Sequence, residues 1–529
     1  MEHAVPQTSN LPGLPLSYSD LVCKEHPDPL SSLLCFNLPR SLSGQTGPSP
    51  LSIFSSVGKQ WLQNAVGDEP LDWDVLSPMF APDPSLDMDY SPLRRPFIPL
   101  PAKDDARCLL NIYFQSFNTF CPTFDEHEFM LHFELEYPVQ PEPCPAKWAC
   151  VNAALALAAS LDPRLSGQAG LFWKNAMMSW APSSWKRRAF IPHRLWWLWY
   201  VPHQMDFRNR LLTRYQAVYS IGTFQSQTSS TIIPMAIRTL HGLSPTETNG
   251  SKHFEIVLVL ARSLDIDHAL QGGDPPTDLS DGDLYRAMPV QEMGTDSIRS
   301  FDFYEAFSAL TRLKEDVYRE LYSVSARKKS DSKVLARVGG LDARLEDWKH
   351  TIPEEYRPGR PTAAETIKQG NCVLVVYMHL SYHNCLLAIH RRTASFTAAS
   401  LRLDSSLKMG NAIRSLNTRA LISSRLCAEA SRATLQLVRF IPVGSQLACG
   451  LIISHIVFAL KLFAVTIVQD PSSPRVQFDL RLIRNVEAFL SQLPISAGDK
   501  GISKLREYCE RYREVTENAM KQGAIQKRQ

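Results

Sequence analysis

Apolar residues recur every three or four positions through most of the chain after residue 104, which is the spacing of helices with one buried face. Leu109, Ile112, Tyr113 and Phe117 share one face of such a helix, and Pro122 ends it. Helical patterns of the same kind cover residues 297–329, 334–353, 373–392, 423–441 and 478–493. No polar and apolar alternation of comparable length competes with them, so the predicted fold class is all-α.

Two stretches are apolar almost all round. The Ala-rich run Trp148–Leu161 is typical of a central helix with close neighbours on every side. The run Leu447–Val468 is long enough to cross a bilayer, but His455 and Lys461 interrupt its middle. A large all-α protein needs at least one helix that is enclosed on all sides, so we predict a buried core helix here and no membrane partner.

The composition of successive parts of the chain indicates how it is divided into domains. Residues 1–103 are rich in Pro, Ser, Leu and Asp without helical periodicity, which predicts a mostly disordered, partly acidic arm. We predict a first helical domain over residues 104–395 and a C-terminal helical part, packed on it, over residues 396–529. The formal net charge of +3 over 529 residues excludes a uniformly basic nucleic-acid-binding surface.

An acidic and apolar segment lies within the arm, at residues 68–93. Asp residues alternate there with large apolar ones, of which Trp73, Phe80 and Tyr90 are the aromatic anchors. This pattern is typical of an activation segment, in which acidic repulsion keeps the anchors exposed for coactivators. An ordinary solvated linker is the alternative.

Six stretches carry recognisable motifs, and they lie at residues 109–129, 144–161, 236–247, 261–289, 318–323 and 341–348. In this order they are a helix, a Pro-Thr-Phe turn and a second helix, then a Trp-led Ala-rich helix, an Ala-Ile-Arg helix ending in His-Gly-Leu, a Leu-Asp to Leu/Met-Pro succession, Tyr-x-x-Leu-Tyr-Ser, and Leu-Asp-x-x-Leu-x-x-Trp. In their order they resemble the fungal-specific transcription factor domain, the middle homology region of fungal zinc binuclear cluster regulators, over about residues 104–395.

The resemblance implies an all-α regulatory domain and a nuclear protein that controls a fungal gene set, such as a metabolic or secondary-metabolite pathway. Within it, Tyr322 and Trp348 are expected to be packed anchors and not ligand contacts. The cluster of Gly273, Pro275 and Pro276 is expected to form a rigid turn.

Residues 180–214 depart from the family pattern. They contain five tryptophans, and seven basic residues stand against the single acidic Asp206, which gives +6. Such a patch could stack single-stranded nucleic acid or serve as a nuclear import signal, and an irregular insertion or an error in the gene sequence is the alternative. The candidate residues are Lys186, Arg187, Arg188, Arg194, Trp196 and Trp197.

The number and spacing of the cysteines indicate how the protein could reach DNA. The chain has 11 of them, an odd number without framework spacing, which predicts reduced thiols inside the cell. No two cysteines are three residues apart, so no zinc cluster is expected within these residues. We therefore expect promoter DNA to be reached indirectly, through a zinc-cluster transcription factor or self-association, or through a cluster encoded upstream.

No enzyme motif emerges. His379 and His383 are spaced i and i+4 with His390 further along, but no acid lies between them, so we predict core or polar-network histidines. Asp104 and Asp105 lack the third carboxylate of an aspartate-rich metal-binding motif, and Asp265 with Asp267 has only His268 beside it. Nucleotide-binding and hydrolase signatures are missing, and no cofactor or metal is expected. An all-α enzyme and a non-nuclear helical scaffold are the competing hypotheses.

Overall fold

The computed structural model describes the helical body of the protein and leaves out the N-terminal arm and several connections. The described residues are 99–120, 124–135, 137, 145–161, 165–180, 233–234, 237, 252–271, 275–277, 303–323, 325–328, 330–360, 372–406, 418–441, 452–460, 463, 467, 473–493 and 500–526. Within these residues the secondary structure is helical, without strands, which confirms the predicted all-α class.

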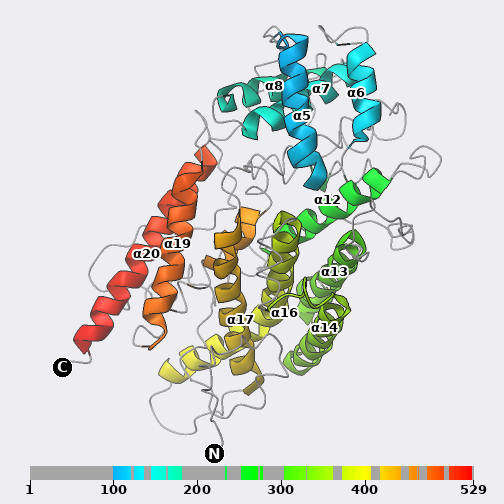
Figure 1. Cartoon of the computed structure of the whole chain (residues 1–529). Coiled ribbons are helices and arrows are strands. Elements are labelled where there is room, and N and C mark those ends of the chain that lie inside the picture. The colour runs from blue at the N-terminus through cyan, green and yellow to red at the C-terminus, as the bar shows by residue number, and fades with distance from the viewer. Residues whose placement is uncertain are drawn as a thin grey trace, which may run out of the picture.

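Four helices form one end of the molecule, at the top of Figure 1: α5 (Lys103–Phe120), α6 (Glu126–Leu135), α7 (Pro145–Leu161) and α8 (Ser166–Trp180). In α5, Leu109, Tyr113 and Phe117 are buried, as the apolar spacing predicts, while Ile112 remains partly exposed. Helix α7 is buried from Trp148 to Ala159, which confirms the predicted central helix. Small alanine side chains allow α5 and α8 to pack closely against it.

The turn between α5 and α6 is held by side chains that replace missing backbone hydrogen bonds. Asn118 donates to the carbonyl of Phe124 at 2.9 Å and accepts from its N–H at 3.1 Å. Asp125 accepts from the N–H of Glu128 at 2.8 Å, which caps the first turn of α6. Residues 125–128 are exposed, so α6 begins at the surface.

The central group contains α12 (Lys252–Leu270), α13 (Phe303–Val317), α14 (Asp331–Thr351), α16 (Cys372–Ser406) and α17 (Thr418–Leu437) (Figure 1). Helix α13 continues into a π-helical turn, Tyr318–Tyr322, and a 3-10 turn follows at Ser325–Lys328. Pro353, which cannot continue a helix, follows the end of α14. Helix α16 runs through residue 395 without a break, and the domain boundaries remain predictions.

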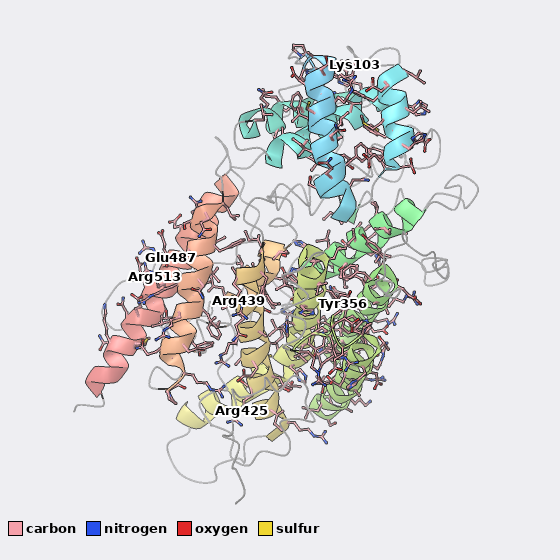
Figure 2. All side chains as sticks on the ribbon, in the orientation of Figure 1. Lys103, Tyr356, Arg425, Arg439, Glu487 and Arg513 are labelled. Atoms are coloured by element: carbon pink, nitrogen blue, oxygen red, sulfur yellow. The ribbon has the colours of Figure 1, made fainter. Side chains whose placement is uncertain are left out.

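Two C-terminal helices, α19 (Val476–Gln492) and α20 (Lys500–Gln526), form an antiparallel pair along one side of the molecule (Figure 1). The helical patterns identified in the sequence end at residue 493, so helix α20 was not predicted. Arg506 of α20 donates to the carbonyls of Leu490, Ser491 and Leu493 and thereby satisfies the free C-terminal end of α19. Figure 2 shows Glu487 and Arg513, which form an ion pair at 2.9 Å between the two helices.

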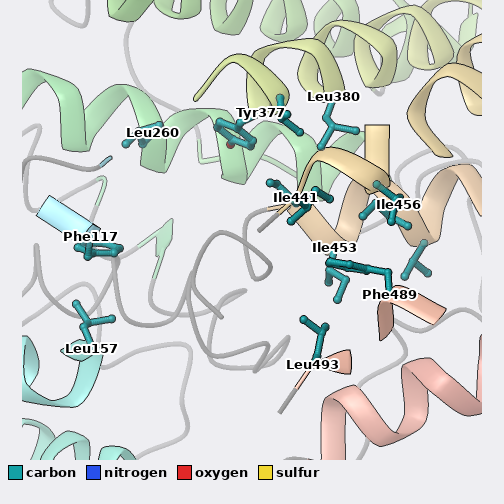
Figure 3. Packing of buried hydrophobic residues seen from close by; sticks show 14 of the residues in the cluster. Phe117, Leu157, Leu260, Tyr377, Leu380, Ile441, Ile453, Ile456, Phe489 and Leu493 are labelled. Atoms are coloured by element: carbon teal, nitrogen blue, oxygen red, sulfur yellow. The ribbon is translucent and has the colours of Figure 1, made fainter. Parts of the chain in front are cut away.

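A large hydrophobic cluster connects these three groups of helices. It includes Phe117 and Leu157 from the N-terminal helices, Tyr377 from α16, and Ile456 and Phe489 from the C-terminal part (Figure 3). A second cluster lies among α12, α13, α14, α16 and α17 and contains both Tyr322 and Trp348. Both residues are buried, so the prediction that they are packed anchors is confirmed.

The predicted core helix at Leu447–Val468 is described only in part. Residues 452–460 are helical, and His455 is buried within them. None of the helices in the described part of the chain is both long enough and apolar enough to cross a membrane.

Trp348 provides a test of the second cluster. Its ring stacks on Tyr382 with centroids 6.0 Å apart, and its Nε1 donates to the carbonyl of Ala306 at 2.8 Å. We expect Trp348→Ala to lower the free energy of unfolding by about 3–5 kcal/mol, because it leaves a cavity and removes the hydrogen bond to Ala306. Leu135→Ala is the control: its side chain is 71% exposed, and it should change stability by less than about 0.5 kcal/mol in denaturant titrations.

Candidate functional site

The residues proposed from sequence as functional lie outside the described residues. They are the activation-segment residues Trp73, Phe80 and Tyr90 and the basic and aromatic residues Lys186, Arg187, Arg188, Arg194, Trp196 and Trp197. These assignments remain predictions. The described body contains a different polar constellation, which the sequence patterns did not single out.

Asp267 lies at the centre of this constellation. Lys314 Nζ from α13 is 2.9 Å from each of the two carboxylate oxygens of Asp267, on α12. Asn384 Nδ2 from α16 donates to Oδ1 at 2.8 Å, and His455 Nε2 lies 3.3 Å from Oδ2. We call these four residues, together with Ser263 and Ser381, the Asp267 network.

The Asp267 network satisfies a fully buried lysine. Besides Asp267, the ammonium group of Lys314 donates to Ser263 Oγ at 3.1 Å and to Ser381 Oγ at 2.8 Å. These three acceptors match the three N–H groups of a lysine. Lys314 has 0% relative exposure and Asp267 2%. Desolvating two charges costs several kcal/mol each, and such a pair persists only when the remaining hydrogen bonds are made, as they are here.

The electrostatics keep Asp267 ionised. Burial raises the pKa of its carboxyl, but the charges of Lys314 and His455 outweigh burial and hold this pKa below its ordinary value. The network therefore contains a carboxylate facing an ammonium group. Because both groups are enclosed by the residues that neutralise them, neither is accessible to a substrate.

A second ion pair joins α12 to α13 and to the chain that follows α12. Arg262 donates to Glu315 of α13 through Nε at 3.0 Å, and through Nη1 to the carbonyl of Thr277 at 2.7 Å. The N–H of Thr277 donates to Asp265 Oδ2 at 2.7 Å. The two aspartates of the Leu-Asp motif thus have separate structural contacts: Asp265 fixes the chain after α12, and Asp267 binds Lys314.

Two consecutive arginines of α16 bind the C-terminal ends of other helices. Arg391 donates to the carbonyl of Leu270, the last residue of α12, and to the hydroxyl of Tyr322. Arg392 donates to the carbonyls of Leu321 and Ala326, beside the π-helical turn. Free carbonyls at helix ends carry partial negative charge, so a buried guanidinium is a suitable partner for them.

The three histidines of α16 are core residues, as predicted from sequence. His379 Nε2 is 2.8 Å from the carbonyl of Tyr356. His390 lies between Asp342 at 3.1 Å and Ser423 at 3.2 Å. Burial lowers the pKa of His379 to about 4 and that of His383 to about 3. All three are buried, as is every residue of α16 from Val375 to Thr393, and among the described residues no group of three metal-binding side chains comes together.

One feature of the sequence could have indicated a buried charge here, although the Asp267 network was not predicted. Leu310, Leu313 and Val317 mark the apolar face of α13, and Lys314 lies on this same face. A lysine within an apolar stripe predicts a buried counter-charge. Its partner could not be identified from spacing, because Asp267 and Lys314 are 47 residues apart.

The architecture is that of an all-helical body whose central charges serve helix packing. Comparison with curated sequences finds fungal transcription factors along most of this chain. Two relatives described as ABC-transporter-regulating transcription factors, from Aspergillus fumigatus and Aspergillus oryzae, are each 30% identical over 92% of the chain and 56% of their own length. The chain therefore spans a little over half the length of these relatives.

A third relative is similar over a larger share of its own length. The Fusaridione A cluster transcription factor fsdR of Fusarium heterosporum is 22% identical over 82% of this chain and 81% of its own length. No family model matches the chain, and no solved structure matches it. The named relatives are transcription factors and not enzymes, which agrees with the family expected from sequence.

The network can be tested with a double-mutant cycle. Removing one partner, as in Asp267→Asn or Lys314→Met, leaves the other charge buried and should cost about 3–5 kcal/mol of unfolding free energy. The double variant should lose less than the sum of the two single losses, because no unpaired charge remains. Additive losses in denaturant titrations would contradict the ion pair.

The histidines predict a pH dependence. The pKa of His383 is about 3 in the folded protein, below that of an unfolded chain, so the unfolded state binds more protons as the pH falls. Stability is therefore fully present above about pH 6.5 and is lost as the pH falls toward the folded pKa. His383→Leu should reduce the loss of unfolding free energy between about pH 7 and pH 5 by about 2 kcal/mol, and an unchanged pH slope would contradict burial of the neutral imidazole.

Proposed function

We propose that this chain is a nuclear transcriptional regulator of a fungal gene set, and that its helical body is a regulatory domain without enzyme activity. One observation carries the proposal: 30% identity to two ABC-transporter-regulating transcription factors over 92% of the chain. The names of the relatives suggest two kinds of target, which are transporter genes and the genes of a secondary-metabolite pathway.

The described body supports a regulatory domain by its construction. Lys314 and Asp267 neutralise each other within the core, and Arg391 and Arg392 bind helix ends. These charged groups fix the arrangement of the helices and offer no exposed reactive group.

Promoter DNA is the target we propose, and it is reached through another element. Specific readout needs side chains held against base edges by a rigid element in a groove. The six-thiolate spacing of a zinc cluster does not occur in these residues. We propose a zinc-cluster transcription factor, or a further part of a longer chain, as the DNA-binding element, with self-association as a second route and coactivators as the downstream partners.

Chromatin immunoprecipitation combined with imaging tests this proposal. The tagged protein should be nuclear and should occupy the promoters whose transcripts change when its gene is deleted. The purified 529-residue chain should show no sequence preference in gel shifts, because its net charge of +3 supplies little phosphate attraction. A cytoplasmic protein with unchanged transcripts would favour a scaffold, and a substrate-dependent activity would favour an enzyme.

The acidic segment gives a separate prediction. Residues 68–93 fused to a heterologous DNA-binding domain should activate a reporter gene, because their aromatic anchors are kept exposed by acidic neighbours. Trp73→Ala combined with Phe80→Ala should reduce reporter activity several-fold. Ser77→Ala with Ser85→Ala is the matched control and should retain activity, whereas a silent wild-type fusion would identify the segment as a linker.

A further inference from the structure

The outer face of α19 is basic and carries one exposed aromatic ring. Its exposed residues include Phe478, Arg481, Arg484 and Asn485, and no carboxylate occurs among the exposed residues of this helix. Phe478 is 46% exposed, although the opposite face of α19 is packed into the core. We call the surface formed by Arg475, Phe478, Arg481 and Arg484 the α19 face.

The α19 face is held in a fixed position from behind. Asp479, on the buried side of α19, accepts two hydrogen bonds from Arg432 of α17, at 2.9 Å and 3.0 Å. Leu480, Ile483 and Val486 contribute to the core beneath the helix. The exposed residues therefore project from a rigid element, which favours binding because little ordering is needed.

The arginines of the α19 face are available to a new acidic partner. Arg481 makes no hydrogen bond or ion pair to another residue in the described part of the chain. Arg475 pairs with Glu429 at 2.8 Å and Arg484 with Glu517 at 3.1 Å, and the two arginine side chains are more than half exposed. Glu429 also pairs with Arg432, and Glu517 with Arg513, so an incoming carboxylate can take either arginine without leaving a glutamate unpaired.

The chain itself contains a segment of complementary chemistry. Residues 68–93 include seven acidic residues and no basic one: Asp68, Glu69, Asp72, Asp74, Asp83, Asp87 and Asp89. Trp73 and Phe80 stand between these acids. Carboxylates alternating with aromatic rings match a helix face on which arginines surround an exposed phenylalanine, through ion pairs, aromatic contacts and cation–π contacts.

The tether is long enough for this contact. Phe80 lies 19 positions before residue 99, where the described body begins, and an extended chain of that length reaches about 60 Å. A compact body of this size has a diameter of roughly 60 Å. Trp73 lies 26 positions before residue 99, and an extended chain of that length reaches about 85 Å, so the first part of the segment can follow the surface of the body to α19.

We propose that the acidic segment 68–93 docks on the α19 face and is thereby withheld from other partners. A segment of the same chain can occupy the face without any second molecule. The inference goes beyond the proposed function, because binding between the two surfaces is measured whether or not the segment activates transcription.

The experiment uses a fluorescent peptide of residues 68–93 and the full chain. The acceptor is the 529-residue protein with Asp72→Asn, Trp73→Ala, Asp74→Asn and Phe80→Ala, so that its own segment does not compete. Fluorescence anisotropy should show binding to this acceptor, weaker binding to the wild-type chain, and weakening with salt. The substitutions Arg481→Glu with Arg484→Glu in the acceptor should reduce affinity on the order of tenfold.

Controls separate this contact from general charge effects. Arg511→Glu with Lys521→Glu makes the same charge change at exposed positions of α20 and should leave affinity unchanged. A peptide with Asp72→Lys and Asp74→Lys should regain affinity for the Arg481→Glu, Arg484→Glu acceptor. The altered side chains are exposed, so thermal unfolding should match the parent, and Phe478→Ala provides a second variant that changes no charge.

Three results would overturn the proposal. One is equal affinity for the parent and for the Arg481→Glu, Arg484→Glu acceptor. Another is an equal loss of affinity in the α20 control. The third is displacement of the peptide by any duplex DNA together with no effect of Phe478→Ala, which would identify a phosphate-binding face. Reporter activity of the fused segment is independent of all three.

Discussion

The burial of Lys314 against Asp267 is the constraint on which the central helices depend. An ammonium group without exposure needs a counter-charge and acceptors for its remaining protons. These come from α12 and α16, with His455 on the far side of the carboxylate. A shift of α13 by one residue would separate Lys314 from all its acceptors at once. The ion pair therefore fixes the position of α13 relative to α12 and α16, whereas apolar contacts alone would allow alternative packings.

The same principle extends to the helix ends. Arg391, Arg392 and Arg506 each donate to carbonyls at the C-terminal end of another helix or turn. A helix end buried in a large body cannot be satisfied by water, so its carbonyls need donors from elsewhere in the chain. Long arginine side chains supply these donors and join elements far apart in sequence. The π-helical turn at Tyr318–Tyr322 is positioned in this way, since Arg392 binds the carbonyl of Leu321 and Arg391 the hydroxyl of Tyr322.

The fold class followed from the sequence where apolar periodicity was strong. The enclosed helix α7 and the amphipathic helices α5, α14 and α19 are present where their patterns predict them. Helix α20 was missed because its apolar positions are few, at Cys509, Tyr512, Val515 and Ala519, among many charged residues. The ion pair of Asp267 with Lys314 was missed for another reason: a tertiary contact between residues far apart leaves no spacing to read.

Buried charges and exposed charges have different roles in this protein. Inside, Lys314, Arg432 and the arginines at helix ends are matched by acceptors and contribute to one arrangement of helices. Outside, the arginines of α19 pair weakly or have no partner among the described residues. Buried pairs are costly to break, whereas exposed ones exchange at little cost. Changes of partner are therefore expected at the surface of α19, while the core beneath it stays fixed.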